Sequence, residues 1–169
     1  MKPRWTRILQ HRWLDETDSR RALPPAAVAR IEIRVTASER RHSGEIRICV
    51  EAGLPLSYLW QRLSARDRAI SMFGKLRVWD TEHNNGVLVY LLLAEHAIQI
   101  VADRGIDRQV NPAQWQRLIE PMRPAFAAGR FEDGLNQAVD TLDGLLVQHF
   151  PLASGQSNPN ELSDHIDLR

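Results

Sequence analysis

Residues 84–102 read NNGVLVYLLLAEHAIQIVA, and this stretch decides the fold. Val87 to Leu93 is apolar at every position, which is typical of a strand buried on both faces at the centre of a sheet. A tight turn at Glu95-His96 separates this strand from a second one, Ala97 to Ala102. The pattern therefore predicts an antiparallel β-hairpin.

A third strand is predicted upstream of the hairpin, at Glu45 to Glu51, where apolar side chains occupy every second position. The connection from Glu51 to Val87 contains a predicted helix, for which Ser64 and Asp67 resemble a capping box. A strand–helix–strand connection within one sheet is normally parallel and right-handed. The strand at Glu45 should therefore run parallel to the one at Val87.

Three more helices are predicted around these strands. The first begins at Pro24-Pro25 and runs to about Arg41, although Ile31 to Val35 also alternates like a strand. The second opens at Asn111-Pro112 and should be kinked or split by the prolines at 121 and 124. The last helix places four large apolar residues on one face: Phe131, Leu135, Leu142 and Leu146.

Length and composition indicate one globular domain with a flexible end. The chain has 169 residues, of which 43% are hydrophobic and 25% charged, so a normal core is expected. The formal net charge of +1 gives no reason to expect nucleic acid as a partner. Cys49 is the only cysteine, which excludes an intrachain disulfide and fits the cytoplasm. Residues 152–169 are rich in Ser, Gly, Asn and Asp, and we expect disorder there.

The N-terminal segment, residues 1–22, is predicted to form a basic amphipathic helix. It has six Lys or Arg residues against three Asp or Glu residues before Ala22. Two readings stay open: residues 1–15 contact a membrane surface or an unknown protein partner, or the helix packs on its own domain. No secretory signal is visible, and no apolar run approaches the ~20 residues that span a bilayer. We expect a cytoplasmic protein, which in the first reading is peripheral to the inner membrane.

Four short motifs, in order along the chain, resemble the TPM domain family, which is often labelled phosphatase-like. His42 to Ile48 resembles the family's "H-x-G-E-I-R" strand opening, and Asn85 to Leu91 resembles its "N-G-V-L-I-Y-L" strand. Ala102 to Ile106 resembles its "G-D-x-G-I" turn, with Ala102 in place of the usual glycine. The segment from Phe131 to Leu135 resembles its "F-x-x-G-L" helix start. The similarity covers about Pro24 to Pro151, so we expect the TPM domain at residues 23–151.

The resemblance implies a fold and a range of activities. The implied fold is a three-layer α/β/α arrangement, with a small mixed sheet that contains a central β-hairpin and helices on both faces. Members of the family include a photosystem II repair protein and bacterial proteins of unsettled role. Weak acid phosphatase activity and divalent-cation binding are attributed to some members, and both become expectations for this chain.

A candidate metal site follows from the strand topology. If the first two strands are parallel and the hairpin reverses direction, the residues before the first two strands and after the third share one edge of the sheet. Carboxylate and amide oxygens suit Ca²⁺ or Mg²⁺. The predicted metal ligands are Glu45, Asn85, Asp103 and Asp107, and the predicted ligand-binding neighbours are Asn84 and Arg104. The alternative is that these residues only cap helices and shape turns.

Three functions are compatible with these features. The first is a domain that binds a divalent cation, the second is a weak metal-dependent acid phosphatase, and the third is a membrane-proximal adaptor or assembly factor without catalysis. The sequence identifies no catalytic residue, because neither a cysteine-phosphatase loop nor an Asp-x-Asp pair after a strand is present. Whether the protein is an enzyme stays open at this point.

Overall fold

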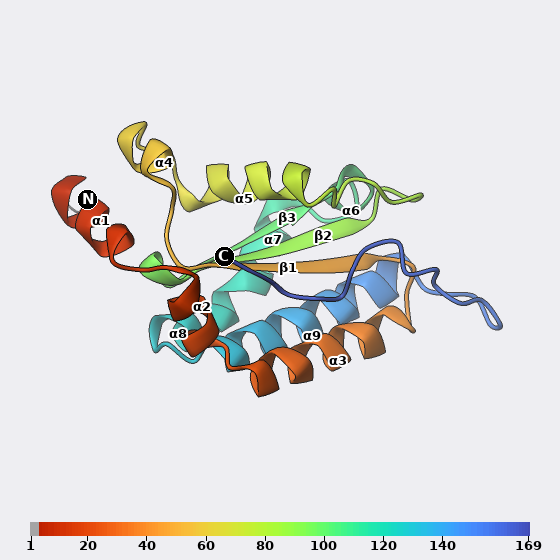
Figure 1. Cartoon of the computed structure of the whole chain (residues 1–169). Helices are drawn as coiled ribbons and strands as arrows, with labels where there is room; N and C mark the ends of the chain where they lie inside the picture. The colour runs from red at the N-terminus through yellow and green to blue at the C-terminus, as the bar shows by residue number, and fades with distance from the viewer. Residues whose placement is uncertain (1–3) are drawn as a thin grey trace.

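In a computed structural model that describes residues 4–169, four strands form one mixed sheet in the order β3-β2-β1-β4 (Figure 1). β1 runs parallel to β2 and to β4, whereas β2 and β3 form an antiparallel hairpin. The strands are β1 (Glu45–Glu51), β2 (Gly86–Leu92), β3 (Ala97–Ala102) and β4 (Asp167–Leu168). The parallel pair and the hairpin predicted from the sequence are confirmed.

The hairpin turn is longer than the sequence suggested. β2 ends at Leu92 rather than Leu93, because η1 (Leu93–Glu95) is a turn of 3-10 helix. His96 then adopts a left-handed conformation with φ of 48°, which lets the chain reverse into β3.

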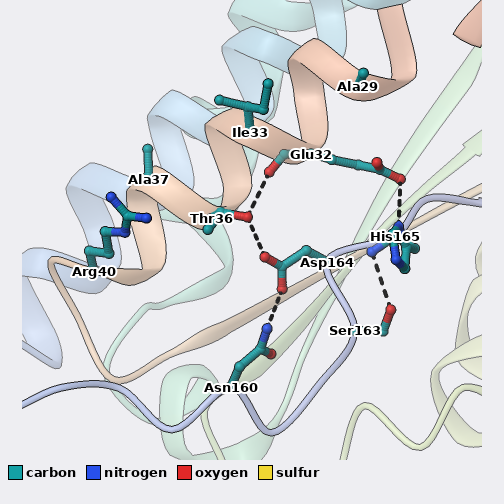
Figure 2. Close-up of a pocket in the computed structure, with 10 residues that line it drawn as sticks. All are labelled: Ala29, Glu32, Ile33, Thr36, Ala37, Arg40, Asn160, Ser163, Asp164 and His165. Atoms are coloured by element: carbon teal, nitrogen blue, oxygen red, sulfur yellow. Dashed lines mark hydrogen bonds and ion pairs between the residues drawn. The ribbon is translucent and has the colours of Figure 1, made fainter.

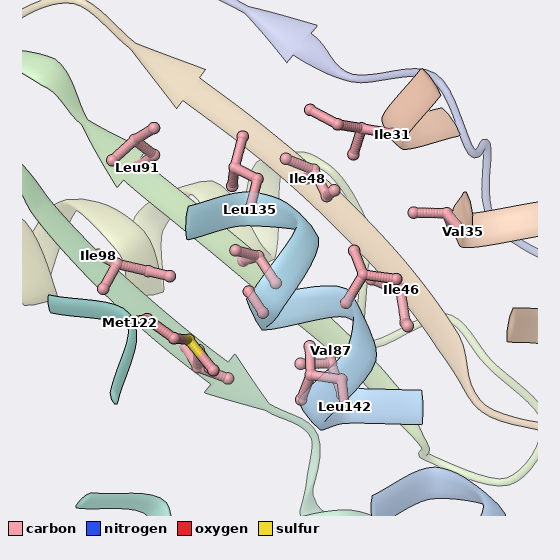
Figure 3. Close-up of a cluster of buried hydrophobic side chains, with 14 of the residues drawn as sticks. Ile31, Val35, Ile46, Ile48, Val87, Leu91, Ile98, Met122, Leu135 and Leu142 are labelled. Carbon is pink, nitrogen blue, oxygen red and sulfur yellow. The ribbon is translucent and has the colours of Figure 1, made fainter. Parts of the chain in front are cut away.

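Helices cover both faces of the sheet and produce the expected three layers. α3 (Pro25–Glu39), α8 (Arg123–Ala127) and α9 (Phe131–His149) cover one face, and α5 (Ala65–Lys75) covers the other (Figure 1). Alternation along the strands divides the core accordingly, with Ile46 and Ile48 facing α9 and Cys49 facing α5. Figure 3 shows Leu135 and Leu142 of α9 against the strand residues Ile46, Ile48 and Val87.

Capping residues and prolines determine where several helices begin and end. The predicted capping box forms at the start of α5, where Ser64 accepts a hydrogen bond from the Asp67 amide and Asp67 accepts one from the Ser64 amide. Asn111 caps α7 (Pro112–Ile119) in the same way. The prolines at 121 and 124 split the helical segment after α7 into η2 (Glu120–Met122) and α8, as the sequence predicted. The short helix α6 (Arg104–Asp107) was not predicted.

The N-terminal segment forms two helices rather than one. α1 (Arg4–Arg12) and α2 (Glu16–Ala22) are separated because Asp15 caps α2 and stops the first helix from continuing. α1 lies against the domain, where the Leu54 amide donates to His11 Nδ1 over 2.9 Å. It also packs against the short helix α4 (Leu56–Trp60). Residues 1–3 of the segment expected to contact a membrane or partner lie outside the described residues.

The C-terminal tail, residues 152–169, is packed in the structure, whereas the sequence led us to expect disorder. Its end forms β4, in which Asp167 and Leu168 pair with Cys49 and Val50 of β1. The Arg169 amide donates to the Val50 carbonyl, and Ile166 is buried. The tail has few hydrophobic residues, and the disorder prediction was based on that. Its order is explained by the backbone hydrogen bonds that it forms with the free edge of β1.

None of the helices within residues 4–169 has the length and apolar character needed to cross a membrane.

Candidate functional site

The predicted site segments meet at one edge of the sheet, as the topology argument required. The Glu45 amide donates to the Asn85 carbonyl over 3.3 Å, and the Asp103 amide donates to the Gly86 carbonyl over 2.9 Å. Glu45 is also the register partner of Gly86. We call this edge, formed by residues 43–45, 84–86 and 102–104, the rim.

The carboxylates of the rim do not gather into the expected four-ligand site. Across residues 4–169, no group of three or more His, Cys, Asp or Glu side chains is placed to hold a metal ion. Gly86 lies between Glu45 and Asp103, and the backbone of Val78 packs directly over it. A Cβ atom at Gly86 would lie only 2.1 Å from the Val78 carbonyl oxygen. The Val78 main chain thus forms a barrier over Gly86, which lies between Glu45 and Asp103 in the sheet.

The predicted site residues on the β3 side of this barrier mainly form hydrogen bonds with their sequence neighbours or with each other. Asp103 caps α6, since its Oδ1 accepts a hydrogen bond from the Arg104 amide over 2.7 Å. Asp107, at the end of α6, is exposed to solvent. Asn84 has a φ of 52° and accepts a hydrogen bond from Arg104 Nε over 2.9 Å, so these two predicted ligand-binding residues bind each other. Asp103 Oδ2 is buried and has no hydrogen-bond partner within the described chain.

Glu45, on the other side of the barrier, is completely buried and is held by the C-terminal tail. Its Oε1 accepts a hydrogen bond from Asn158 Nδ2 over 2.8 Å, and its Oε2 accepts one from the Leu162 amide over 3.1 Å. Burial raises the pKa of the Glu45 carboxyl to about 7, although both hydrogen bonds act in the opposite direction. No Lys or Arg of residues 4–169 forms an ion pair with this carboxylate that would offset its burial.

Two side-chain amides, one in the rim and one in the tail, each leave an oxygen atom without a partner among the described residues. Asn85 Nδ2 donates to the Ser43 carbonyl over 2.9 Å, but Asn85 Oδ1 is buried and accepts no hydrogen bond from the described residues. Asn158 Oδ1 is likewise buried and accepts no hydrogen bond from the described residues, although Asn158 Nδ2 donates to Glu45. The Asn85 amide is held by Ser43, whereas the Asn158 amide contacts the Glu45 carboxylate, so one carboxylate and one amide, both hard oxygen ligands, meet at this corner of the rim.

A polar pocket of about 400 Å³ adjoins this corner. Its lining includes the oxygen-bearing side chains of Ser43, Glu82, Asn158 and Glu161. Glu161 also contacts the loop that leads into the rim, because its Oε2 accepts a hydrogen bond from the Glu82 amide over 2.8 Å. Asn158 connects this pocket to the buried Glu45 carboxylate, because it lines the pocket and also contacts Glu45.

A second pocket, of about 570 Å³, lies between α3 and the tail (Figure 2). Its contacts fasten the tail to α3: Thr36 Oγ1 donates to Asp164, and Glu32 Oε1 accepts a hydrogen bond from the Ile166 amide over 2.9 Å. Beneath these contacts, Glu39 accepts a hydrogen bond from the Ile46 amide over 2.8 Å. Burial raises the pKa of Glu39 to about 9, and the neighbouring carboxylates of Glu45 and Asp164 act in the same direction.

Ser38 and His42, which are buried, and Asp143, which is partly buried, form a cluster whose residue types suggest a catalytic triad. In a working triad the carboxylate bonds one histidine nitrogen and the serine bonds the other. Here His42 Nδ1 faces the Gly44 carbonyl at 3.0 Å, and Ser38 Oγ lies between His42 Nε2 (2.8 Å) and Asp143 Oδ1 (3.0 Å). The cluster thus joins the end of α3 to α9, and its connectivity is that of a structural link.

Sequence reasoning missed Asn158, Leu162 and Glu161, because the tail was expected to be disordered. The available signal was faint: Ile166 and Leu168 alternate with polar residues at the end of an otherwise polar segment. Nothing in the tail upstream of these residues predicts that it returns to the rim.

The fold and the motifs together define the class of protein. The TPM domain family model matches residues 17–145, and the chain therefore belongs to the TPM domain family. It is similar in structure to the BA42 protein of the psychrophilic bacterium Bizionia argentinensis, with a TM-score of 0.75 and 26% identity, over 86% of this chain and 94% of that one. The N-terminal domain of a P. gingivalis protein has a TM-score of 0.62 and 18% identity, over 83% and 94% of the two chains, and this likeness concerns the fold alone. No curated protein matches the chain.

Proposed function

We propose that this chain binds a divalent cation, Ca²⁺ or Mg²⁺, at the corner of the rim where Glu45 and Asn158 meet. The observation that carries the proposal is the buried, partnerless amide oxygen of Asn158 beside a fully buried carboxylate. A buried polar atom without a hydrogen bond costs about 1–3 kcal/mol, so each such atom in a native structure calls for a water or an ion.

The donor set fits a hard cation. Carboxylate and amide oxygens are the ligands that Ca²⁺ and Mg²⁺ prefer, and either ion completes its coordination with water. The pocket beside Asn158 has room for those water molecules. With a single carboxylate among the ligands, affinity is expected to be weak, because ligand charge is what tightens such sites.

Binding requires one local rearrangement. Asn158 now turns its Nδ2 group toward Glu45, and a cation at that position would repel it. A half-turn of the side-chain amide brings Asn158 Oδ1 to the same place and releases Nδ2 toward the pocket. This exchange leaves the backbone of the tail where it is, since the Leu162 amide still holds the second oxygen of Glu45.

Phosphoester hydrolysis demands more than a cation. It needs a nucleophile and positive charge on the phosphoryl oxygens. Arg104, which the sequence predicted as a ligand-binding residue, is engaged with Asn84 on the far side of the Val78 barrier. Cation binding is therefore the function that the described residues support best.

Titration of the whole chain with Ca²⁺ and then Mg²⁺, followed by amide chemical shifts in NMR spectra, tests the proposal. Shifts are expected at residues 43–45, at Asn85 and at residues 158–162. Glu45→Gln should weaken the affinity about tenfold or more, because it removes the only charged ligand. Asp103→Asn is the matched control, since it removes a carboxylate beyond the Val78 barrier and should leave the affinity unchanged.

Two results would contradict the assignment. One is a spectrum without localised shifts at millimolar cation. The other is loss of binding in Asp103→Asn with normal binding in Glu45→Gln, which would move the site to the β3 side of the rim.

A further inference from the structure

Two short helices at the end of the domain opposite the rim carry exposed leucine and tryptophan side chains. Leu9 lies in α1 and Trp13 directly follows that helix, whereas Leu56 and Trp60 are the first and last residues of α4. α1 and α4 pack against each other at the same end of the molecule (Figure 1). We call these four residues the Leu-Trp patch.

The helices that display the patch are firmly attached to the domain. Arg7 Nε donates to Glu95 over 2.7 Å, and His11 Nε2 lies 3.1 Å from the same carboxylate. Leu59 of α4 is buried in the core beneath α5, and Ile8 of α1 packs against that core. Both helices are thus attached to the domain through residues outside the patch.

The exposure of the two tryptophans is unusual for a side chain of this size. Trp13 is 82% exposed and Trp60 is 70% exposed. Large exposed apolar side chains that occur together mark interaction surfaces more often than free surface. Tryptophan in particular prefers the boundary between water and lipid, where its ring is amphipathic enough to suit both sides.

The charges around the patch select among possible partners. Residues 4–13 and 54–63 together contain four arginines and no Asp or Glu. Arg12 and Arg62 are exposed, whereas Arg7 is paired with Glu95. A second copy of the same patch would bring arginines against arginines, which is unfavourable. An anionic lipid surface would meet the same arginines with opposite charge.

We infer that the Leu-Trp patch docks the protein on an anionic lipid surface, with Trp13 and Trp60 as the apolar anchors and Arg12 and Arg62 as the source of positive charge. Docking of this kind is peripheral, since the patch consists of the outer sides of two short helices. It is also reversible and sensitive to salt, because part of the attraction is electrostatic.

Co-sedimentation of the full chain with vesicles tests this inference. Two compositions are compared, phosphatidylcholine alone and an equal mixture of phosphatidylcholine and phosphatidylglycerol. The wild type should sediment with the mixed vesicles and not with the neutral ones. In the double variant Trp13→Ser, Trp60→Ser the partition coefficient onto mixed vesicles should fall about tenfold or more. In the double variant Arg12→Gln, Arg62→Gln it should fall by a similar factor, because each arginine contributes about a few-fold.

Trp79→Ser is the matched control, because Trp79 is also a half-exposed tryptophan but lies near the rim, one residue after the Val78 that packs on Gly86. Circular dichroism confirms that each variant is folded. The inference is overturned if the wild type ignores anionic vesicles, if the Trp13 and Trp60 variant binds them as the wild type does, or if Trp79→Ser loses as much. Self-association of the wild type that the double variant abolishes, without vesicle binding, would instead make the patch a contact between two copies.

Discussion

Replacing Glu39 with glutamine is expected to remove much of the pH dependence of this protein's stability. Glu39 lies at the end of α3, is buried, and has a pKa raised from 4.5 to about 9. Between these two values the native state holds a proton that the unfolded state has released. Stability contributed by this proton is therefore fully present below the unfolded pKa and is lost progressively as the pH rises toward the folded pKa.

The size of the effect follows from the number of protons. One extra proton on the native state lowers the free energy of unfolding by about 1.4 kcal/mol for each unit of pH increase. From about pH 6 to about pH 8, both inside the interval, the wild type should lose about 2.7 kcal/mol through Glu39 alone. Glu39→Gln keeps an oxygen that accepts from the Ile46 amide but has no proton to lose. The variant should therefore gain that amount relative to the wild type.

Urea unfolding of both proteins at the two pH values measures the difference directly. Taking the difference between wild type and variant removes most of the contribution of Glu45, which is common to both. Glu16→Gln, on the exposed surface of α2, controls for the loss of a carboxylate as such. If the stability difference between wild type and Glu39→Gln were the same at both pH values to within about 0.5 kcal/mol, Glu39 would not be held as a neutral acid.

Three further predictions concern the packing that shapes the domain. Gly86→Ala should destabilise the protein by about 1–3 kcal/mol in urea unfolding, because the new Cβ would meet the Val78 carbonyl. If the variant is as stable as the wild type, the loop at Val78 moves aside without cost. Arg68→Met should lower the free energy of unfolding by about 3–5 kcal/mol, because it leaves the buried Glu51 carboxylate without its 2.6 Å ion pair. Adding Glu51→Gln should restore part of that loss. If the double variant recovers none of it, the unpaired carboxylate is not the cause. Leu142→Ala, at the fully buried centre of α9, should cost about 2–5 kcal/mol and lower the thermal midpoint, and a change near zero would show that α9 is not essential to this core.

The strands and most helices were predictable because their signals are local. Glu45–Glu51 and Ala97–Ala102 agree with the predicted boundaries, since alternation is read directly from neighbouring residues. Each end of β2 was misplaced by one residue. The strand begins at Gly86 rather than Val87, and it ends at Leu92 because the residues of the 3-10 turn that follows, Leu93 and Ala94, are as apolar as the strand itself. The helix at 112–127 broke where proline removes a backbone donor, which is again a local effect.

The candidate site was predictable only to the level of topology. The strand order brings Glu45, Asn85 and Asp103 to one edge, and this was inferred correctly. The Val78 carbonyl that separates the carboxylates depends on how a loop folds over Gly86, and no side-chain pattern records it. The contribution of Asn158 depends on a contact across more than a hundred residues, made by a tail with little hydrophobic content.

The pairing of β4 with β1 also bears on how the protein avoids aggregation. An uncovered edge strand offers its free amides and carbonyls to any other chain that can extend the sheet. In this fold the end of the chain covers that edge, with the Ala52 amide and the Val50 carbonyl both bonded to Arg169. Proteolytic removal of residues 167–169 would therefore expose an edge of β1 to which another chain could add a strand, even if the rest of the domain stayed folded.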